Sequence, residues 1–266
     1  MFETIGVIGT GAMGSAVARL AAGKKPLHLS NRTPEKAQKL AAELSARVST
    51  NEEIAQNCDL IFLAVKPQMM PGVLKALAPV LAARTDRFVL VTMAAGLTTD
   101  TIQKLSGGAY PVIRMMPNTP IAVGAGIITY CGNGAAEEEL SAFAALLSDA
   151  GTLDPIDEHL IDAASALAGC GPAFVDLFLE ALADGAVACG LPREKALLYA
   201  AQTVEGEARA ARVSGEHPGK RKDVVCSPAG STIQGVRALE RGGFRSAATE
   251  AVIAAYERNL ELKKGE

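Results

Sequence analysis

The residues with the clearest chemical potential lie in one short stretch, Asp223 to Glu240, which reads D-V-V-C-S-P-A-G-S-T-I-Q-G-V-R-A-L-E. A Ser-Pro turn leads into a loop of small residues and then into a sequence with helical periodicity. The first backbone N–H groups of a helix have no partner within it, and the helix dipole favours an anion there. Thr232 adds a hydroxyl group that donates or accepts a hydrogen bond. The stretch predicts a site for a small carboxylate, with an ordinary capped helix start as the alternative.

A second motif lies near the other end of the chain, where G-x-G-x-x-G follows a short β-branched segment and opens a helical one. In dinucleotide-binding folds the first glycine allows a tight turn and the second lets the pyrophosphate approach the backbone. The third lets helix and strand pack closely. Because both flanking segments fit, the motif predicts a cofactor site formed by Gly9, Thr10, Gly11, Ala12, Met13 and Gly14.

The end of the next strand candidate indicates which nicotinamide cofactor is used. An NAD-specific site places Asp or Glu there for the ribose 2′-hydroxyl. This chain instead has Arg32, which could clamp a 2′-phosphate, beside Ser30, Asn31 and Thr33, which could donate hydrogen bonds. We therefore expect a preference for NADPH, with acceptance of NADH left open. The alternative is a solvated loop arginine.

Two further segments end strand candidates at the carboxyl edge of the expected sheet, where cofactors lie in open α/β folds. We expect both to line the ribose and nicotinamide region: Ala64, Val65, Lys66 and Pro67 in the first, and Ala94, Ala95 and Gly96 in the second. Lys66 could be a catalytic acid, but a lysine that positions cofactor or backbone is the commoner case.

Other polar residues have structural alternatives that we favour. Asn118 could face the nicotinamide, although pinning of its loop is favoured. Asp176, Glu180 and Asp184 share a helix face but have no histidine beside them, so pairing with basic groups or solvent is favoured over a metal site. His217 precedes a proline in a loop, where a structural or exposed role is commoner than proton donation.

The elements around these motifs predict an α/β fold. Strand-like and helix-like segments alternate up to about residue 157, which favours a doubly wound parallel sheet of Rossmann type. We expect strands at 4–8, 27–31, 59–65, 88–92, 112–115 and 126–130, and helices at 14–22, 35–44 and 71–81. From residue 158 only helices are expected, with a break or kink at 169–172. The predicted domains are 1–157, which binds the dinucleotide, and 158–266, which is helical.

The helical domain carries an apolar surface that a single chain does not easily cover. The segment Ala173 to Cys189 is apolar nearly all round, so it must be buried on most sides. About 110 residues of helix are too few for that, which favours a second subunit over burial against the first domain.

Composition excludes several function classes. The 266 residues carry a net charge of -3, which does not favour nucleic acid or membrane as a partner. We expect no apolar run long enough to span a bilayer and no signal peptide. The 5 Cys residues contain no C-x-x-C pair, so reduced, buried thiols in a cytoplasmic protein are expected. The 3 His residues are scattered, and no metal is expected.

Together these segments resemble the Δ1-pyrroline-5-carboxylate reductase family along essentially the whole chain. The resemblance rests on six segments: G-T-G-A-M-G at 9–14, A-V-K-P at 64–67, A-A-G at 94–96, R-M-M-P-N-T-P at 114–120, G-C-G-P-A-F at 169–174 and S-P-A-G-S-T-I-Q-G-V-R-A-L-E at 227–240. It implies NAD(P)H-dependent reduction of a cyclic imine to L-proline, the last step of proline biosynthesis. It also implies a homodimer with interlocked C-terminal helices, and dimers of this family often assemble into rings of five.

The resemblance also implies residue roles. Backbone N–H groups of Gly230, Ser231 and Thr232 would hold the substrate carboxylate beside Ser227, and the Thr232 hydroxyl would bond the ring nitrogen as the catalytic contact. Asn51 would contact the cofactor, as would Ala64, Lys66 and Ala95. The chain departs from the family's S-G-S-G-P-A-Y at Ala168, Cys170 and Phe174, so it lacks the hydroxyl groups that the family has at these positions.

Some questions stay open at this stage. A reductase of another cyclic imine or of a β-hydroxyacid is the alternative enzyme, and a non-catalytic NADP-sensing scaffold is the alternative outside catalysis. The sequence does not decide the oligomer size or the acceptance of larger imines. It also leaves open the roles of Cys170, Lys220, Arg221 and Lys222.

Overall fold

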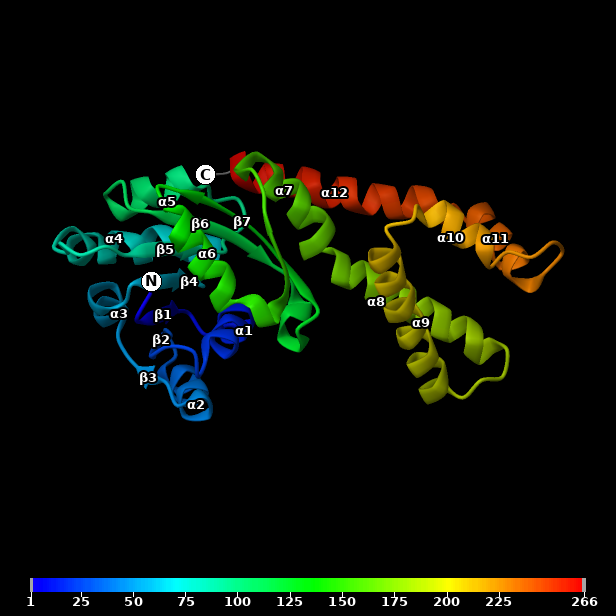
Figure 1. Ribbon diagram of the computed structural model, residues 1–266, viewed down its shortest axis with the longest axis horizontal. Coiled ribbons are helices and arrows are strands. Elements are labelled where there is room, and N and C mark those ends of the chain that lie inside the picture. Colours follow the sequence, from blue (N-terminus) through cyan, green and yellow to red (C-terminus); the bar gives the residue numbers. More distant parts are fainter. Residues whose placement is uncertain (1, 265–266) are drawn as a thin grey trace. The chain divides into compact units, whose positions relative to one another are not determined.

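The computed structural model describes residues 2–264, with side chains through residue 261. By compactness it divides into two units, residues 1–169 with 255–266, and residues 170–254. The first unit contains an eight-stranded sheet with helices along it, and the second is helical (Figure 1). The α/β fold class with a helical C-terminal region is therefore confirmed.

The sheet has the strand order β3-β2-β1-β4-β5-β6-β7-β8. Neighbouring strands are parallel except for β6 and β7, which pair antiparallel through the register Arg114↔Cys131. The strands are β1 Ile5–Ile8, β2 Leu27–Ser30, β3 Arg47–Val48, β4 Leu60–Leu63, β5 Val89–Thr92, β6 Val112–Pro117, β7 Gly126–Asn133 and β8 Gly151–Pro155. Short β3 and β8 lie at the two edges and escaped the sequence analysis, because exposed edge strands lack an apolar run.

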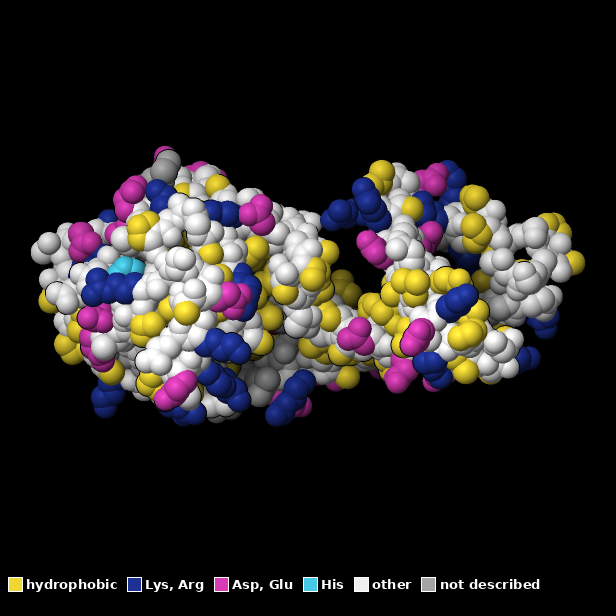
Figure 2. Space-filling view, turned by 90° about the horizontal axis from the view of Figure 1, so that it is seen from below, with side chains coloured by type: hydrophobic (Ala, Val, Ile, Leu, Met, Phe, Trp, Pro, Cys, Tyr) yellow, Lys and Arg dark blue, Asp and Glu magenta, His cyan; other side chains and the backbone are white. Residues whose placement is uncertain are grey.

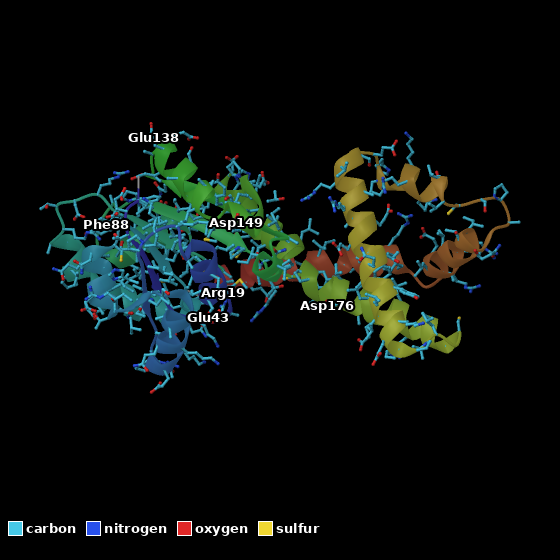
Figure 3. All side chains as sticks on the ribbon, turned by 60° about the horizontal axis from the view of Figure 1, so that its bottom comes forward. Arg19, Glu43, Phe88, Glu138, Asp149 and Asp176 are labelled. Carbon is cyan, nitrogen blue, oxygen red and sulfur yellow. The ribbon has the colours of Figure 1, made fainter. Side chains whose placement is uncertain are left out.

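The helices of this unit cover both faces of the sheet. They are α1 Ala12–Ala21, α2 Pro34–Leu44, α3 Asn51–Asn57, α4 Met70–Ala82, α5 Thr99–Ser106 and α6 Glu137–Leu146, with 3-10 turns η1 Pro67–Met69, η2 Thr119–Val123, η3 Ser148–Ala150 and η4 Glu158–Leu160. Residues of α1, α2 and α6 share one buried cluster, and residues of α3, α4 and α5 share the other. Strand side chains alternate between them: Phe62 joins the first cluster and Ile61 the second. On the surface, Arg19 joins α1 to Glu43 of α2 (Figure 3).

A long helical stretch follows β8. It comprises α7 Ile161–Ala164, a π-helical turn Ser165–Gly169 and α8 Gly171–Ala188. The expected break or kink at 169–172 is confirmed, because the π-helical turn ends at Gly169, Cys170 lies between the two elements, and α8 begins at Gly171. Pro172 lies in the first turn of α8, where its missing N–H costs no bond.

The predicted domain boundary at residue 157 differs from the division by compactness. The first unit extends to Gly169 and includes the end of the last helix. The physical reason is a set of polar contacts: Asp162 of α7 bonds Arg114 of the sheet, and Asn259 Nδ2 donates to the Asp162 carbonyl at 3.1 Å.

Among the described residues, one helical stretch, Glu158–Ala188, is long and apolar enough to cross a membrane by length and composition. The expectation that no apolar run reaches that length is therefore wrong. Only 11% of its most apolar window is buried within this chain. A core helix covered by a second subunit has the same composition.

The second unit contains α8, α9 Arg193–Ser214, α10 Pro218–Val224, α11 Ser231–Arg241 and the first part of α12 Phe244–Lys264. Gly190, with φ of +96°, turns the chain between α8 and α9. Hydrophobic side chains gather on the surface of this unit (Figure 2). Those with more than half of their surface exposed are Leu177, Leu198, Tyr199, Val213, Val224 and Val225.

Candidate functional site

A groove of about 1000 Å³ runs along the carboxyl edge of the sheet in the first unit. It brings together segments that are far apart in sequence. The predicted cofactor residues that line it are Gly9, Gly11, Ser30, Asn31, Arg32, Asn51, Ala64, Val65 and Lys66. The groove therefore joins the ends of β1, β2 and β4, as expected for a doubly wound sheet.

The glycine motif has the geometry that its chemistry requires. Gly9 has φ of +103°, and a Cβ there would lie 2.6 Å from the Ala64 carbonyl oxygen. A Cβ on Gly14 would lie 2.0 Å from the Gly9 carbonyl oxygen. By contrast, no atom lies within 4 Å of a Cβ built on Gly11, which begins α1 as an N-cap without a side-chain bond. Open space beside uncapped N–H groups fits a pyrophosphate.

The Thr10 hydroxyl supports the same conclusion. Thr10 is buried, and its Oγ1 has no hydrogen-bond partner among the described residues. Buried polar atoms without a partner are uncommon and require an explanation. A bound group at this turn would provide a partner.

Several predicted donors are already used within the loops. Asn31 accepts from the Thr10 N–H at 3.0 Å and donates to the Thr33 carbonyl at 3.0 Å. Ser30 Oγ donates to Asn51 Oδ1 at 2.6 Å. Asn31 and Ser30 therefore hold the loops of the groove in shape. Among the described residues the Ser30 hydroxyl hydrogen is used, whereas one N–H of the Asn31 amide and the Asn51 amide N–H₂ have no partner.

Positive charge at the groove comes from Arg32, Lys36 and Lys66, which are all exposed. Lys36 was missed by the sequence analysis. The sequence did contain the information needed to find it. Thr33-Pro34 starts α2 and so places Lys36 in the first helical turn, close to Arg32 in the chain. Two cations beside a helix N-terminus favour an anion such as a phosphate.

Other predicted cofactor residues do not line this groove. Ala12 is exposed at the start of α1, Met13 packs against the core, and Pro67 begins η1. Ala94 and Gly96 are buried after β5, with Ala95 half-buried between them. Asn118 pins its loop, as favoured: Oδ1 accepts from the Ile127 N–H at 2.9 Å, and Nδ2 donates to the Ala168 carbonyl at 3.2 Å.

The predicted substrate loop lies in the second unit. The Gly230 N–H donates to the Ser227 carbonyl at 3.1 Å, which closes a turn with Ala229 at φ of +58°. This corrects the expectation for Gly230, because its N–H closes the turn and is not free for a carboxylate. Gly230 is the N-cap of α11 without a side-chain bond, so the N–H groups of Ser231 and Thr232 remain. Ser231 and Thr232 are both exposed.

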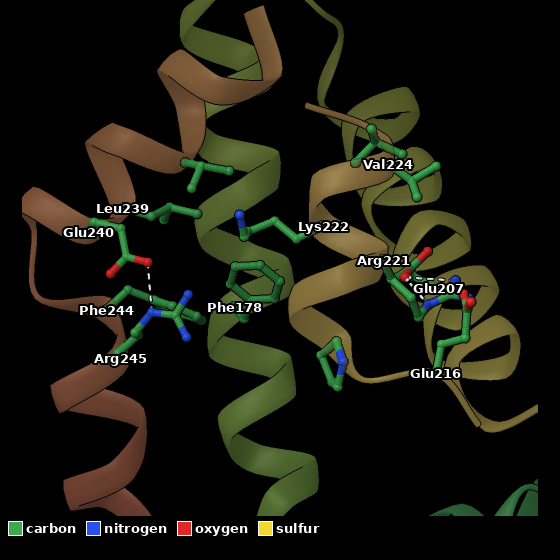
Figure 4. Close-up of a pocket in the computed structure, with 13 residues that line it drawn as sticks. Phe178, Glu207, Glu216, Arg221, Lys222, Val224, Leu239, Glu240, Phe244 and Arg245 are labelled. Atoms are coloured by element: carbon green, nitrogen blue, oxygen red, sulfur yellow. Dashed lines mark hydrogen bonds and ion pairs between the residues drawn. The ribbon is translucent and has the colours of Figure 1, made fainter. Parts of the chain in front are cut away.

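The basic residues before this loop have structural partners. Lys220 Nζ lies 2.5 Å from Glu216 Oε1, Arg221 bonds Glu207 at 2.8 Å, and Lys222 pairs with Asp223. Arg221, Lys222 and Glu207 border a cavity of about 590 Å³ in the second unit (Figure 4). Its apolar lining includes Phe178 and Phe244, whose ring centroids lie 5.5 Å apart.

The remaining candidates have structural surroundings. His217 Nδ1 accepts from the Gly219 N–H at 3.1 Å and so caps α10. Asp184 pairs with Arg193 at 2.6 Å. Within residues 2–264 no three His, Cys, Asp or Glu side chains gather as metal ligands would. Of the cysteines only Cys58 is buried, and its burial raises the pKa of the thiol to about 12.

Comparison with known proteins gives two family models. The model described as pyrroline-5-carboxylate reductase dimerisation matches residues 158–262, and the model described as NADP oxidoreductase, coenzyme F420-dependent, matches residues 4–96. The first supports homo-oligomerisation, and the second supports a nicotinamide cofactor.

Individual relatives match over nearly the full length. The pyrroline-5-carboxylate reductases of Synechocystis sp. and Escherichia coli are 42% and 36% identical to this chain. The former match covers 98% of both chains, and the latter 99% of this chain and all of the relative. The solved Streptococcus pyogenes 1-pyrroline-5-carboxylate reductase has a TM-score of 0.87 at 30% identity, covering 96% and 97% of the two chains. The Plasmodium falciparum pyrroline carboxylate reductase with NADP bound has a TM-score of 0.86 at 31% identity, covering 98% of each. The motif-based prediction is confirmed: the chain belongs to the pyrroline-5-carboxylate reductase family of NAD(P)H-dependent oxidoreductases.

Proposed function

We propose that this chain reduces Δ1-pyrroline-5-carboxylate to L-proline, the final step of proline biosynthesis, with NADPH as the preferred hydride donor. The observation that carries the proposal is the start of α11, an uncapped helix N-terminus behind a tight Ser-Pro turn. That feature suits a small carboxylate beside a single hydrogen-bonding group. The same chain also has the open glycine turn in its first unit, the nucleotide-binding unit. Relatives with the reductase name match both units.

On the substrate side, the N–H groups of Ser231 and Thr232 would hold the carboxylate, and the Thr232 hydroxyl would bond the ring nitrogen. Ser227 supports them indirectly, because its carbonyl accepts the Gly230 N–H. A protonated imine already carries the charge that attracts hydride. The protein therefore needs mainly to orient the ring, and positioning alone contributes several kcal/mol. No essential histidine or aspartate is expected.

On the cofactor side, Gly9, Gly11 and the start of α1 would hold the pyrophosphate, with Thr10 Oγ1 as a further contact. Asn51 and the backbone of Ala64 and Val65 would line the ribose region. NADPH supplies the hydride when it is bound. Arg32 would clamp the 2′-phosphate, with Lys36 and Thr33 beside it, and this favours NADPH over NADH because only NADPH carries that group.

For the assembly, we propose a homodimer through the helical region, with interlocked C-terminal helices and further assembly into a ring of five dimers. The exposed apolar side chains of α8 and α9 support a covered face there, including Leu177 at 68% and Leu198 at 62% exposure. Burial of α8 against a second copy would also account for the membrane-like composition of the stretch Glu158–Ala188, and we propose a cytoplasmic location.

The first test measures NADPH oxidation by the purified protein with Δ1-pyrroline-5-carboxylate, repeated with NADH, and identifies the product as proline. Thr232→Ala should lower kcat/KM by one to two powers of ten, about 1.4–2.8 kcal/mol, with NADPH affinity unchanged. Thr203→Ala is the matched control, since its hydroxyl bonds the Tyr199 carbonyl on α9. Unaltered kcat/KM in Thr232→Ala would remove that residue from the mechanism. Folded protein that binds NADPH without turnover would favour another imine or a sensor.

A further inference from the structure

A buried arginine lies within the sheet of the first unit. Arg114 lies on β6, has none of its surface exposed, and is paired with two carboxylates. Its Nη2 donates to Asp162 Oδ1 at 2.6 Å, and its Nη1 lies 3.5 Å from Glu158 Oε1. Asp162 belongs to α7 and Glu158 to η4, so the arginine ties the sheet to the start of the long helical stretch.

One of these carboxylates extends the network to another element. Glu158 accepts from both the backbone N–H and the hydroxyl of Thr99, each at 2.8 Å. Thr99 is the first residue of α5, where the helix dipole favours a carboxylate. The segment just before it is 94–98, which follows β5 at the carboxyl edge of the sheet. Arg114 is therefore linked through Glu158 to that edge segment.

A second tie joins the same strand to the same helical stretch. Asn118, which directly follows β6, donates to the Ala168 carbonyl within the π-helical turn. A π-helical turn changes the partner of its carbonyl groups, and such turns occur frequently at functional sites. The strand thus holds the helical stretch at residue 162 through Arg114 and at residue 168 through Asn118.

Stability alone is a poor explanation for the arginine. A buried ion pair loses hydration, and well-packed apolar residues often stabilise a core as well or better. The Arg114 Nε is also buried with no hydrogen-bond partner among the described residues, which adds an unsatisfied donor. A buried arginine that does little for stability suggests that it serves to hold neighbouring segments in position.

We infer that Arg114 is a positioning residue for hydride transfer. It holds Asp162 of α7 directly, and through Glu158 and Thr99 it holds the end of segment 94–98, at the edge of the sheet where the nicotinamide half of the cofactor would lie. The adenine half would lie at Arg32 and Asn51, on other elements of the groove. Loss of the Arg114 geometry should therefore affect the rate of hydride transfer much more than the affinity for NADPH. This inference rests on the proposed reductase function.

The test compares Arg114→Lys with Arg84→Lys. Arg84 is a matched control because its side chain is also buried, at 4% exposure, but it donates to the Ala55 and Cys58 carbonyls and pairs with Asp86, away from this network. Both variants should lower the Tm. Only Arg114→Lys should lower kcat, by at least about 10-fold, with NADPH Kd within about twofold and a larger primary isotope effect from NADPH deuterated at the transferred position. Equal kcat in the two variants, or a matching loss of NADPH affinity, would overturn the inference.

Two further measurements keep the test decisive. If Arg114→Lys does not fold, Glu158→Gln removes one charge at a partly exposed position, and it should show the same kcat loss on a smaller scale. Hydrogen–deuterium exchange of segments 94–99 and 158–169 should rise in either variant and stay unchanged in Arg84→Lys. Hydrogen–deuterium exchange does not depend on turnover, so the two proposals fail separately. A parent protein without reductase activity would count against the proposed function. Unchanged exchange in the Arg114 and Glu158 variants would count against the inference.

Discussion

Two glycines of the dinucleotide motif should respond to alanine in opposite ways. A Cβ on Gly14 would lie 2.0 Å from the Gly9 carbonyl oxygen and 2.9 Å from Ala64 Cβ, so α1 must move away from the strand ends. A Cβ on Gly11 would meet no atom within 4 Å, and its φ of -72° suits any residue. Gly14→Ala should therefore damage the fold, while Gly11→Ala should damage only cofactor binding.

The expected sizes follow from this geometry. Overpacking of a buried site costs about 1–3 kcal/mol, which lowers the Tm of a chain of this size by roughly 3–10 °C. Alanine is the better helix former, so any loss in Gly14→Ala must come from the clash. In Gly11→Ala the apo stability should stay within about 0.5 kcal/mol. Keeping the pyrophosphate from the N–H groups should cost about 2–3 kcal/mol, or roughly 30- to 150-fold in NADPH Kd.

Thermal unfolding without cofactor and fluorescence titration with NADPH measure the two effects separately. Each variant is the control of the other, since both replace one glycine of the same motif with the same residue. A Gly11→Ala protein that binds NADPH with parental Kd would refute the placement of the pyrophosphate against Gly11. A Gly14→Ala protein with parental Tm would refute the close packing inferred for α1.

Three other predictions follow from separate features. Arg32→Ser should raise the KM for NADPH about 10-fold and leave that for NADH nearly unchanged; equal effects on both cofactors would contradict a 2′-phosphate contact. Because burial raises the pKa of Cys58, its neutral thiol contributes its full stabilisation to the folded state below about pH 9. Between about pH 9 and about pH 12 this contribution to the free energy of unfolding falls by about 1.4 kcal/mol per pH unit. The free energy of unfolding, measured in urea at pH 8 and pH 10.5, should therefore change less with pH in Cys58→Ala than in the parent. An equal change in both proteins would contradict the raised pKa of Cys58. Leu198→Glu should reduce the oligomer mass in light scattering, because it places a charge on the exposed apolar face of α9; an unchanged mass would exclude that face from the interface.

The sequence by itself determined the features that depend on neighbours along the chain. The glycine motif predicted the turn after β1, because the positive φ of Gly9 is a local requirement. Apolar runs predicted the central strands, and the small-residue loop predicted the uncapped start of α11. The family was recognisable for the same reason, since its motifs are contiguous segments.

Only the tertiary structure decided how side chains distant in sequence are used. The Gly230 N–H closes a turn, and the Ser30 hydroxyl donates to Asn51, so neither is a free donor, although residue type alone suggested it. Arg114 meets Glu158 and Asp162 across 44 and 48 residues, and no local pattern marks those partners. Sheet order and helix placement bring such groups together, and these depend on packing of the whole unit. For that reason the sequence predicted the glycine motif, while the buried network of Arg114, Glu158 and Asp162 emerged only from the fold.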